Sequence, residues 1–500
     1  MEGGSARLLA LPPAVVADRS PDAVADACDY FDPDGVWVLA TERAPRAHAT
    51  VRSATGGAEA VPVVHTPLAR DDAPRHDRLG SADGGVDVVS VRDPSALLEV
   101  GRQLRDGVID AAPETTTFVA CPVAVEVDAT QLSATLPVAA DLAALVATAP
   151  GNVVVLSDLL PADYDHEWTL DAPDGADETD GPLTVRLHGL GAAEGYGSRD
   201  VACLTLSPSG AVGTERVGAD RFGLRALEGV GPRTADRLRE AGVRSRADVR
   251  RTPLRQLTDV TGVGRDTAER ATRHAEVLDS GDPLRLSTSA LPGEPAARPP
   301  LCLDIETDGL SPTIIWQVGV YDPSADEHHA FTEREDPDDP GRVVERFVTW
   351  LLADHPERDL LTWNGNRFDY RHLTSFVERY CPEYAAAWDG YWKHDLYDWA
   401  VRQDNALLPG RTNKLDHVAR KLGYAGADTG LDGAATAAAY GRLMRTGEPL
   451  DWARHEAYCE DDCRALWHVY EALKAADRRD SVAGAAERTT ESEQTGLGDF

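Results

Sequence analysis

Two acidic residues, Asp304 and Glu306, lie inside the apolar stretch LCLDIET, residues 301–307. In a β-strand, alternate side chains point to opposite faces, so both carboxylates would share one face while their apolar neighbours enter a core. Burying an ionised carboxylate without a partner carries a large free-energy cost. Something in the fold must therefore compensate this pair.

Further acids follow at the ends of other predicted elements. The run LLTWNG, residues 360–365, is typical of a buried strand that ends in a turn, and Asp369 follows at the start of a helix. Residues 451–473 have the spacing of an amphipathic helix, on which Tyr458 and Asp462 lie four residues apart on one face. A helix packed on the sheet would present both side chains toward it.

The intervening residues predict the elements that must position these groups. IIWQVGVY and HHAFTE, residues 314–321 and 328–333, are typical of two further strands, and VVERFVTWLLA, residues 343–353, has helical spacing. The expected order is three strands, a helix, a strand and then helices. This order predicts an α/β domain with a mixed sheet and flanking helices.

Together these segments resemble the DnaQ-like, or DEDD, 3′–5′ exonuclease family, which has the RNase H-like fold. Three motifs carry the resemblance: DxE (Asp304, Glu306), NGxxFD (Asn364, Gly365, Phe368, Asp369) and YxxxD (Tyr458, Asp462), the last marking the tyrosine (DEDDy) subclass. The stretch LPGRTNKLDHVARKLGY, residues 408–424, is similar to the YprB-like branch. The resemblance covers residues 300–475.

The resemblance implies hydrolysis of phosphodiester bonds with two Mg²⁺ or Mn²⁺ ions as cofactors. Two ions about 3.5–4 Å apart can activate a water and stabilise the leaving oxygen, and four carboxylates supply the hard oxygen ligands that such ions need. Asp304 would bridge both ions, Glu306 and Asp369 would complete the shell, and Asp462 would hold the water-activating ion. Tyr458 would orient the water.

Several alternatives stay open at this stage. The acids could be paired structural groups in a degenerate RNase H-like domain, which would leave a non-catalytic nucleic-acid-binding adaptor. An RNase H-type endonuclease is a third possibility. His455, Cys459 and Cys463 form a stripe on the last helix, but one helix cannot close a tetrahedral metal site, so we interpret the stripe as packing. Asp395 matches a structural family position.

Residues 216–279 contain an internal repeat. LEGVGPRTADRL recurs as VTGVGRDTAERA, which aligns Gly229 and Gly231 with Gly262 and Gly264 and resembles tandem helix-hairpin-helix motifs. Glycines permit tight turns whose backbone N–H groups approach a phosphate, and the following helix adds its positive dipole end. Residues 216–275 carry 14 arginines and 8 acids, within a chain of net charge −34. We expect a small all-α module that binds nucleic acid, and the alternative is a helical spacer.

The nucleic-acid contacts predicted for this chain are Gly229, Gly231, Arg233, Gly262, Gly264, Arg265 and, in the second exonuclease motif, Asn364. We expect DNA to be favoured over RNA, although the motifs contain no legible contact to the sugar.

Residues 1–210 alternate strand-like and helix-like runs, which predicts an α/β sandwich with a parallel or mixed sheet. The order of these runs is similar to a RecA- or KaiC-like domain, in degenerate form. No lysine precedes Lys393, and the phosphate-binding motif GxxxxGK[ST] is missing, so we expect a structural or partner-binding role without nucleotide hydrolysis.

The whole chain of 500 residues is too long for one core, which predicts several domains. Only 4 of its 50 basic residues are lysine, and this acid- and arginine-rich composition is typical of a salt-accumulating halophilic archaeon. Seven cysteines without a CxxC pair favour a reducing cytoplasm, and no leader or membrane span is expected. Residues 280–299, rich in proline, are predicted to be a linker, and residues 476–500 a polar tail.

Overall fold

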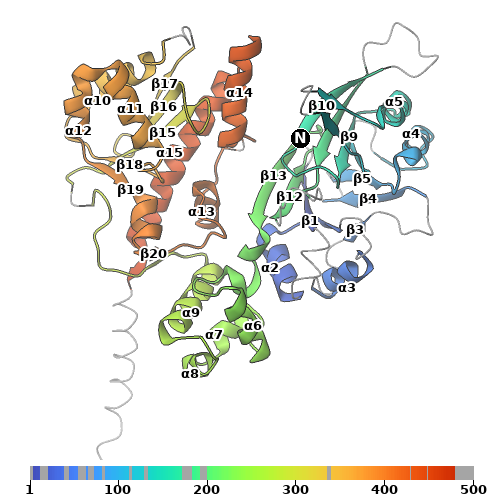
Figure 1. The fold of residues 1–500 in the computed structure, drawn as a ribbon, viewed down its shortest axis with the longest axis horizontal. Helices are drawn as coiled ribbons and strands as arrows, with labels where there is room; N and C mark the ends of the chain where they lie inside the picture. Colours follow the sequence, from blue (N-terminus) through green and yellow to red (C-terminus); the bar gives the residue numbers. More distant parts are fainter. Residues whose placement is uncertain are drawn as a thin grey trace, which may run out of the picture. The chain divides into compact units, whose positions relative to one another are not determined.

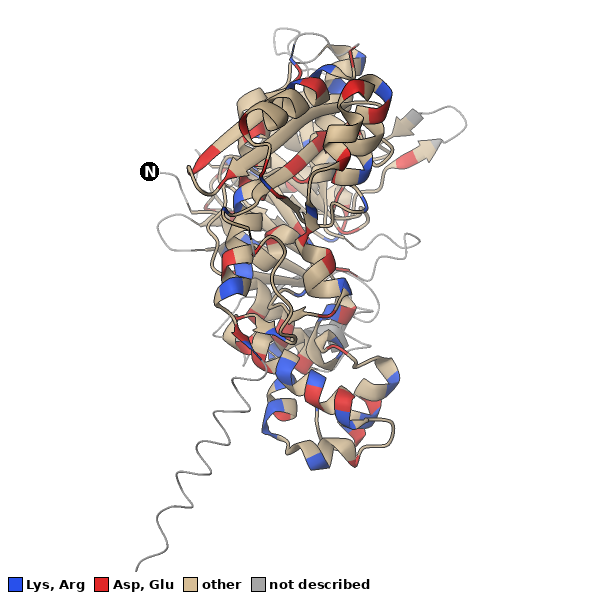
Figure 2. Ribbon diagram, turned by 90° about the vertical axis from the view of Figure 1, so that its left-hand side faces the viewer, with Lys and Arg blue, Asp and Glu red and all other residues tan. Residues whose placement is uncertain are grey.

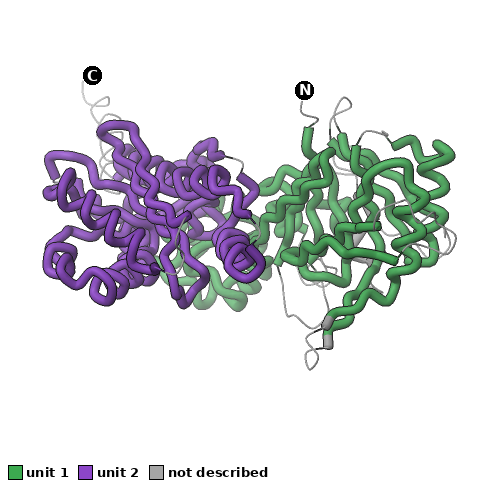
Figure 3. The backbone as a smooth tube through the Cα atoms, turned by 90° about the horizontal axis from the view of Figure 1, so that it is seen from above, with its two compact units in different colours: residues 1–271 green, residues 272–500 purple. Residues whose placement is uncertain are grey.

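The computed structural model describes most of the chain. The described residues are 4–11, 21–38, 44–54, 63–65, 73–80, 85–111, 115–128, 133–171, 183–191, 200–294, 296–334, 339–427, 429–447 and 449–478. They divide into two compact units, residues 1–271 and residues 272–500 (Figure 3).

Two mixed sheets form the first part of unit 1 (Figure 1). The first sheet has the order β13-β12-β1-β2-β3, with strands β1 (Ala6–Leu11), β2 (Gly35–Val38), β3 (Val63–His65), β12 (Asp200–Leu206) and β13 (Val212–Gly218). The second has the order β10-β11-β9-β6-β5-β4, with strands β4 (Arg75–Leu79), β5 (Val86–Ser90), β6 (Thr117–Ala120), β9 (Val153–Ser157), β10 (Asp165–Leu170) and β11 (Leu183–Gly189). A separate hairpin joins β7 (Glu126–Asp128) to β8 (Ser133–Thr135).

The two sheets pack face to face because alternate residues of their strands share one core. Val154 and Leu156 of β9 belong to the same buried cluster as Leu8 of β1 and Trp37 of β2. Val155, between them, faces the other way. Helices cover the outer faces: α2 (Pro21–Phe31), α3 (Ala44–Ala54), α4 (Leu97–Arg105, preceded by the 3₁₀ turn η1, Pro94–Ala96) and α5 (Ala139–Thr148). The result is an α/β sandwich whose two sheets lie between layers of helices.

The sequence indicated a single sheet here, and the structure corrects that expectation. β1, β12 and β13 were not predicted, and they build most of the additional sheet. β1 pairs with β12, almost two hundred residues away, so this pairing cannot be inferred from local periodicity. The resemblance of this region to RecA-like domains stays a prediction.

A small helical module ends unit 1. Its elements are η2 (Ala219–Arg221), η3 (Gly223–Ala226), α6 (Pro232–Glu240), α7 (Arg246–Arg251), α8 (Leu254–Thr258) and α9 (Arg265–Ser280), which runs past the end of the unit. Val230 and Val263, the middle residues of the two GVG turns, are both buried. The turns therefore anchor each hairpin through valine and leave the glycines at the surface.

A buried carboxylate ties this module to the sandwich. Asp26 of α2 accepts a hydrogen bond from the backbone N–H of Gly223 (2.7 Å). It also forms an ion pair with Arg246 of α7. Asp26 is 6% exposed, so both contacts lie in a largely desolvated environment. The module and the sandwich are therefore joined by a specific polar contact.

Unit 2 contains a five-stranded sheet of order β17-β16-β15-β18-β19. Its strands are β15 (Leu301–Thr307), β16 (Ile315–Asp322), β17 (Glu327–Thr332), β18 (Leu360–Thr362) and β19 (Lys393–Asp395). β15 pairs antiparallel with β16 and parallel with β18. The sheet is thus mixed, as the sequence predicted.

The two faces of this sheet carry different helices. α10 (Arg342–Asp354), α11 (Asp369–Tyr380) and α12 (Ala385–Asp389) share a core with Leu301, Leu303 and Ile305 of β15. α13 (Leu415–Lys421) and α15 (Trp452–Ala475) share the opposite core with Cys302. The remaining elements are η4 (Pro382–Tyr384), the π-helical turn η5 (Asp398–Arg402) and α14 (Gly433–Thr446). The apolar residues of LCLDIET therefore take the face predicted for them.

The region predicted to be a linker contains a short strand. β14 (Leu284–Arg285) lies between β20 (Ala406–Leu407) and β21 (Asp477–Arg478) in a three-stranded sheet. Arg285 is fully buried, with its guanidinium 5.5 Å from the centroid of the Trp399 ring. This stacking and the backbone hydrogen bonds to β20 and β21 hold Leu284 and Arg285 in a sheet, so this part of the predicted linker has regular secondary structure. β21 likewise includes the first residues of the predicted tail, and residues 479–500 lie outside the described residues.

The fold class predicted from the sequence is confirmed: an α/β multidomain chain with a small all-α module in the middle. Within the described part of the chain, no helix is both long and apolar enough to cross a membrane.

Replacing Asp26 by asparagine should destabilise unit 1, because Arg246 would lose its charged partner in a buried place. We expect the free energy of unfolding in urea to fall by about 1.5–3 kcal/mol, the range for hydrogen bonds to charged groups. Asp220→Asn is the matched control, since its pair with Arg225 is largely exposed and should contribute less than about 1 kcal/mol. Equal losses in the two variants would contradict a joining role for Asp26.

Candidate functional site

The first exonuclease-like motif lies in the middle of the unit 2 sheet. Asp304 and Glu306 are on β15, on the face opposite the α10–α11 core, as predicted. Asp304 is half-buried and Glu306 is 6% exposed. In the described part of the chain, Glu306 has neither a hydrogen-bond partner nor an ion-pair partner. A buried carboxylate with no protein partner is the kind of group that a cation would compensate.

The second motif is a tight turn between β18 and α11. Asn364 has a positive φ of 67°, and a side chain at Gly365 would clash with Thr362. Asp395 holds this turn by accepting hydrogen bonds from the backbone N–H groups of Asn364 (2.9 Å) and Asn366 (3.0 Å). Asp395 is thus structural, and the turn delivers Asp369 at the first residue of α11.

The third motif lies on α15, which packs across β15 and β16. Cys459, Cys463 and Leu466 form the buried face of this helix, while Tyr458 and Asp462 are half-buried beside it. The neighbouring Asp461 points away and accepts hydrogen bonds from the Tyr424 hydroxyl (2.9 Å) and the Ala427 N–H (2.8 Å). The carboxylate of Asp461 is therefore engaged outside the candidate site.

Electrostatic coupling connects the four carboxylates, although they come from three separate segments. Burial raises the pKa of Asp304 well above its usual value, and the charges of Glu306, Asp462 and Asp369 raise it further. Burial and the charges of Asp462 and Asp369 also raise the pKa of Glu306 well above its usual value. All four predicted acids are therefore close enough to repel one another.

The other two acids respond in the same way. Burial raises the pKa of Asp369 to about 7, against opposing backbone hydrogen bonds at Asp369 itself and Ile305. Burial raises the pKa of Asp462 to about 8, although its hydrogen bond with Tyr458 lowers it. Burial and the surrounding acids also raise the pKa of Tyr458, so its hydroxyl stays protonated at neutral pH.

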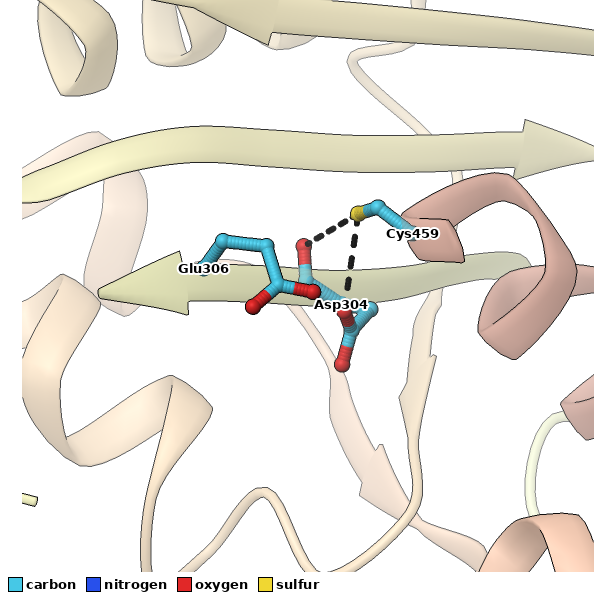
Figure 4. Close-up of side chains that lie close together, drawn as sticks. All are labelled: Asp304, Glu306 and Cys459. Carbon is cyan, nitrogen blue, oxygen red and sulfur yellow. Dashed lines mark hydrogen bonds between the residues drawn. The ribbon is translucent and has the colours of Figure 1, made fainter. Parts of the chain in front are cut away.

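These residues fit divalent metal ions. The donor atoms of Asp304, Glu306 and Cys459 all lie within 4.8 Å of one another (Figure 4). Gln317, opposite Glu306 on β16, is fully buried with both amide atoms lacking a partner in the described structure. Unpaired buried oxygens, mutually repelling acids and hard donors together suit a bound cation.

The stripe of His455, Cys459 and Cys463 on α15, which the sequence analysis interpreted as packing, makes three different contacts. His455 packs edge-on against Trp316, and Cys463 contacts the carbonyl oxygen of Gly319 (3.6 Å). Cys459 instead places its Sγ 3.4 Å from Oδ2 of Asp304. Cys459 and Gln317 were not singled out as site residues from the sequence, because only the strand register and the packing of α15 place them beside the acids.

The predicted nucleic-acid interface lies on the helical module. Gly229 and Gly262 have positive φ values of 79° and 82°, which explains the glycines at these turns. Gly231 has φ −75°, and Gly264 is not in the positive-φ region either. Only the first glycine of each turn therefore has a backbone conformation that favours glycine. A Cβ at either Gly231 or Gly264 would meet open space, as a surface for close approach of a ligand requires.

The two hairpins are joined by reciprocal arginines. Arg237 of α6 donates to the carbonyl oxygen of Thr261 (3.0 Å), just before the second GVG turn. Its repeat equivalent, Arg270 of α9, donates to Glu228 (2.6 Å), just before the first turn. Each arginine thus holds the turn of the other hairpin, and neither is free to bind phosphate.

Other arginines of the module are also engaged. Arg265 pairs with Glu269 (2.8 Å) while remaining exposed, whereas Arg233 is exposed and has no ion pair within the described residues. Figure 2 shows basic and acidic positions interleaved along the helices of this module. The predicted contact Asn364 lies in unit 2, where its Oδ1 accepts a hydrogen bond from Arg402 (3.0 Å).

Comparisons with known proteins agree with this architecture. Residues 301–474 match the RNase_H superfamily model, and residues 223–276 match the SAM-like helix-hairpin-helix tandem model. The C-terminal part of the chain is therefore an RNase H-like domain, and the middle module is a tandem helix-hairpin-helix. No curated protein matches the chain.

Among solved structures, product-bound exonuclease I is 21% identical with a TM-score of 0.20, covering 29% of this chain and 43% of that chain. E. coli exonuclease I in complex with a dT13 oligonucleotide is also 21% identical with a TM-score of 0.20, covering 29% and 40%. The ExoI/SSB-Ct complex is 18% identical with a TM-score of 0.20, covering 34% and 43%. This chain spans less than half the length of each of these proteins.

The metal-free protein should lose stability as pH rises. Because the folded pKa values of Asp369 and Asp462 are raised to about 7 and about 8, the folded state binds more protons than the unfolded state between pH about 4 and about 8. The stability that these two protonated acids contribute is fully present below their unfolded pKa values. It is lost as the pH rises through their folded pKa values. In chelator, the thermal midpoint of the wild type should therefore fall over this window.

The variant Asp462→Asn should weaken this fall and raise the midpoint near pH 8, because one repelling charge is removed. Asp461→Asn should change the slope less, because Asp461 hydrogen-bonds to Tyr424 and Ala427 and its charge raises the pKa of Asp462 less than burial does. Thermal scans across the window test both variants. A wild-type midpoint that rises from pH 4 to 8 would contradict the raised pKa values of Asp369 and Asp462.

Proposed function

We propose that this protein is a divalent-metal-dependent 3′–5′ exonuclease that hydrolyses nucleic acid, with DNA favoured over RNA. The observation that carries the proposal is the placement of Asp304 and Glu306 on the central strand of an RNase H-like sheet, where Asp369 and Asp462 from two other segments lie near enough for their charges to raise the pKa of both. The adjacent Tyr458 completes the set expected for the tyrosine subclass. The tandem helix-hairpin-helix module supports a nucleic-acid substrate.

The four carboxylates would hold two ions, Mg²⁺ or Mn²⁺, which when bound supply a nucleophilic water and stabilise charge at the reacting phosphate. Asp304 and Glu306 come from the central strand β15, Asp369 from the first residue of α11 and Asp462 from α15, so these four carboxylates are the residues that would hold the ions. The buried face of β15 keeps these carboxylates fixed relative to one another.

Tyr458 would act as a hydrogen-bond donor. Its pKa is raised by burial and by the neighbouring acids, so it keeps its proton at neutral pH and cannot serve as a general base. Among the acids, Asp462, one turn further along α15, has the largest effect on this pKa. We infer that the neutral hydroxyl orients the attacking water. The positive charge that stabilises the reacting phosphate would come from the bound metal ions.

The helix-hairpin-helix module would bind the strand through backbone N–H groups at Gly229–Gly231 and Gly262–Gly264. Arg237 and Arg270 are engaged within the module, so fewer arginine side chains can pair with phosphate than the local charge indicates. Arg233, Arg265 and the Asn364–Arg402 pair are the remaining candidate polar contacts.

Residues 1–210 are proposed to bind a protein partner. Because all seven cysteines are free, a reducing cytoplasm is the proposed location.

Asp304→Asn should abolish hydrolysis, with a loss of about a thousandfold or more, because a central metal ligand would be lost. Full-length protein with Mn²⁺ should release mononucleotides from the 3′ end of a 5′-labelled single strand, and parallel DNA and RNA strands test the preference. Asp461→Asn is the matched control and should retain most of the turnover. Internal products would establish an endonuclease, and binding without hydrolysis by the wild type would establish an adaptor.

The double variant Gly231→Val, Gly264→Val should bind nucleic acid poorly in both low and molar salt. A side chain at these positions meets open space within the protein, so the fold should persist while close approach of a phosphate is blocked. The matched pair Arg233→Ala, Arg265→Ala should matter mainly at low salt, because arginine–phosphate pairing weakens with a slope of about −0.9 per neutralised phosphate on duplex DNA. Binding isotherms at both salt concentrations compare the pairs, and a larger loss for the arginine pair in molar salt would make the hairpins spacers.

A further inference from the structure

One buried thiol stands beside the candidate acids and has no role in the function proposed so far. Cys459 is fully buried on α15, and its Sγ lies 3.4 Å from Oδ2 of Asp304. Figure 4 shows the sulfur turned toward β15, on the same side as the two carboxylates. The donor atoms of Asp304, Glu306 and Cys459 are all within 4.8 Å of one another. The three residues together form a compact mixed-donor group.

A glycine admits this thiol to the site. Gly319 on β16 is paired with Asp304, and a Cβ built on Gly319 would lie 2.5 Å from Sγ of Cys459. Any other residue at 319 would push α15 outward. The missing side chain therefore brings the sulfur into the layer that holds the carboxylates.

Two unpaired polar groups indicate that this layer is built for a ligand. Glu306 is 6% exposed and has no hydrogen bond or ion pair to the described residues. Gln317, its neighbour across the strand pair, is fully buried, and neither amide atom has a partner in the described structure. Native proteins rarely leave such groups unsatisfied, because each costs about 1–3 kcal/mol.

The separation of the donors suits direct coordination. At metal–sulfur and metal–oxygen distances of about 2.3 Å and 2.0–2.2 Å, ligands at a tetrahedral angle lie about 3.5 Å apart. The Sγ–Oδ2 separation of 3.4 Å is close to this value. Thiolate sulfur is a soft ligand that favours ions such as Zn²⁺, whereas Mg²⁺ binds through oxygen.

We propose that Cys459 is a metal ligand together with Asp304 and Glu306, and that this triad selects a thiophilic divalent cation over Mg²⁺. The inference rests on the proposed assignment of Asp304 and Glu306 as metal ligands. On binding, the thiol S–H bond is replaced by a sulfur–metal bond, and the proton leaves to solvent. The site is thereby softer than one made of carboxylates alone.

The test uses Co²⁺ added to metal-free, full-length protein. Sulfur coordination produces an intense ligand-to-metal charge-transfer absorption in the near ultraviolet, which oxygen ligands do not produce. We expect this band in the wild type and in Cys463→Ser, a control one turn further along α15 with equal burial. Cys459→Ser should lose the band, and its affinity for Cd²⁺ should fall at least tenfold while its affinity for Mg²⁺ stays within twofold.

The inference is overturned if the wild type shows no such band, if Cys459→Ser keeps it, or if the band disappears only in Cys463→Ser. Should Cys459→Ser not fold, Cys459→Ala and the wild-type spectrum decide in the same way. The nuclease assay separates this inference from the proposed function. Mg²⁺-supported hydrolysis without the band would refute only the thiolate ligand, whereas the band without any hydrolysis would refute only the exonuclease.

Discussion

Mutual repulsion among four buried or half-buried carboxylates is the constraint on which the architecture of unit 2 depends. Three structural features hold them: strand register holds Asp304 and Glu306, the start of α11 holds Asp369, and α15 holds Asp462. None of these features supplies a positive charge, since the strongest influences on Asp304 are burial and other acids. Holding the acids together therefore lowers the stability of the folded protein, and a bound cation would offset this loss.

The contacts that position these acids include no cationic side chain among the described residues. Gly319 lets α15 approach the sheet, and Gly365 lets the chain turn tightly against Thr362. Asp395 uses its carboxylate on backbone N–H groups, so its negative charge is satisfied locally. Positioning by packing and backbone hydrogen bonds leaves the oxygens of the four acids available for a ligand.

Local periodicity predicted much of this from the sequence. The alternation in LCLDIET fixed which side chains share a face, and the i, i+4 spacing placed Tyr458 beside Asp462, because both patterns follow from backbone geometry alone. Contacts between distant segments could not be predicted in this way. Cys459 reaches Asp304 only because Gly319, on a third element, lacks a side chain.

The same limit explains the other differences. β14 is two residues long and buries an arginine, whereas sequence reasoning expects arginine at the surface. The first sheet of the N-terminal sandwich, which the sequence did not predict as a separate sheet, depends on pairing between β1 and β12. The glycines of the repeat predicted tight turns correctly, but only the coordinates separate Gly229, with its positive φ, from Gly231.

The crossed arginines of the helix-hairpin-helix module have a mechanical consequence. Since Arg237 holds the second turn and Arg270 the first, the two turns cannot shift independently. In the proposed function these turns would bind phosphates at a fixed separation, so the module would act as a rigid gauge of backbone spacing. A strand that is kinked or over-stretched would reach one turn and miss the other. Such a module would sense the shape of the strand that it holds, without reading a single base.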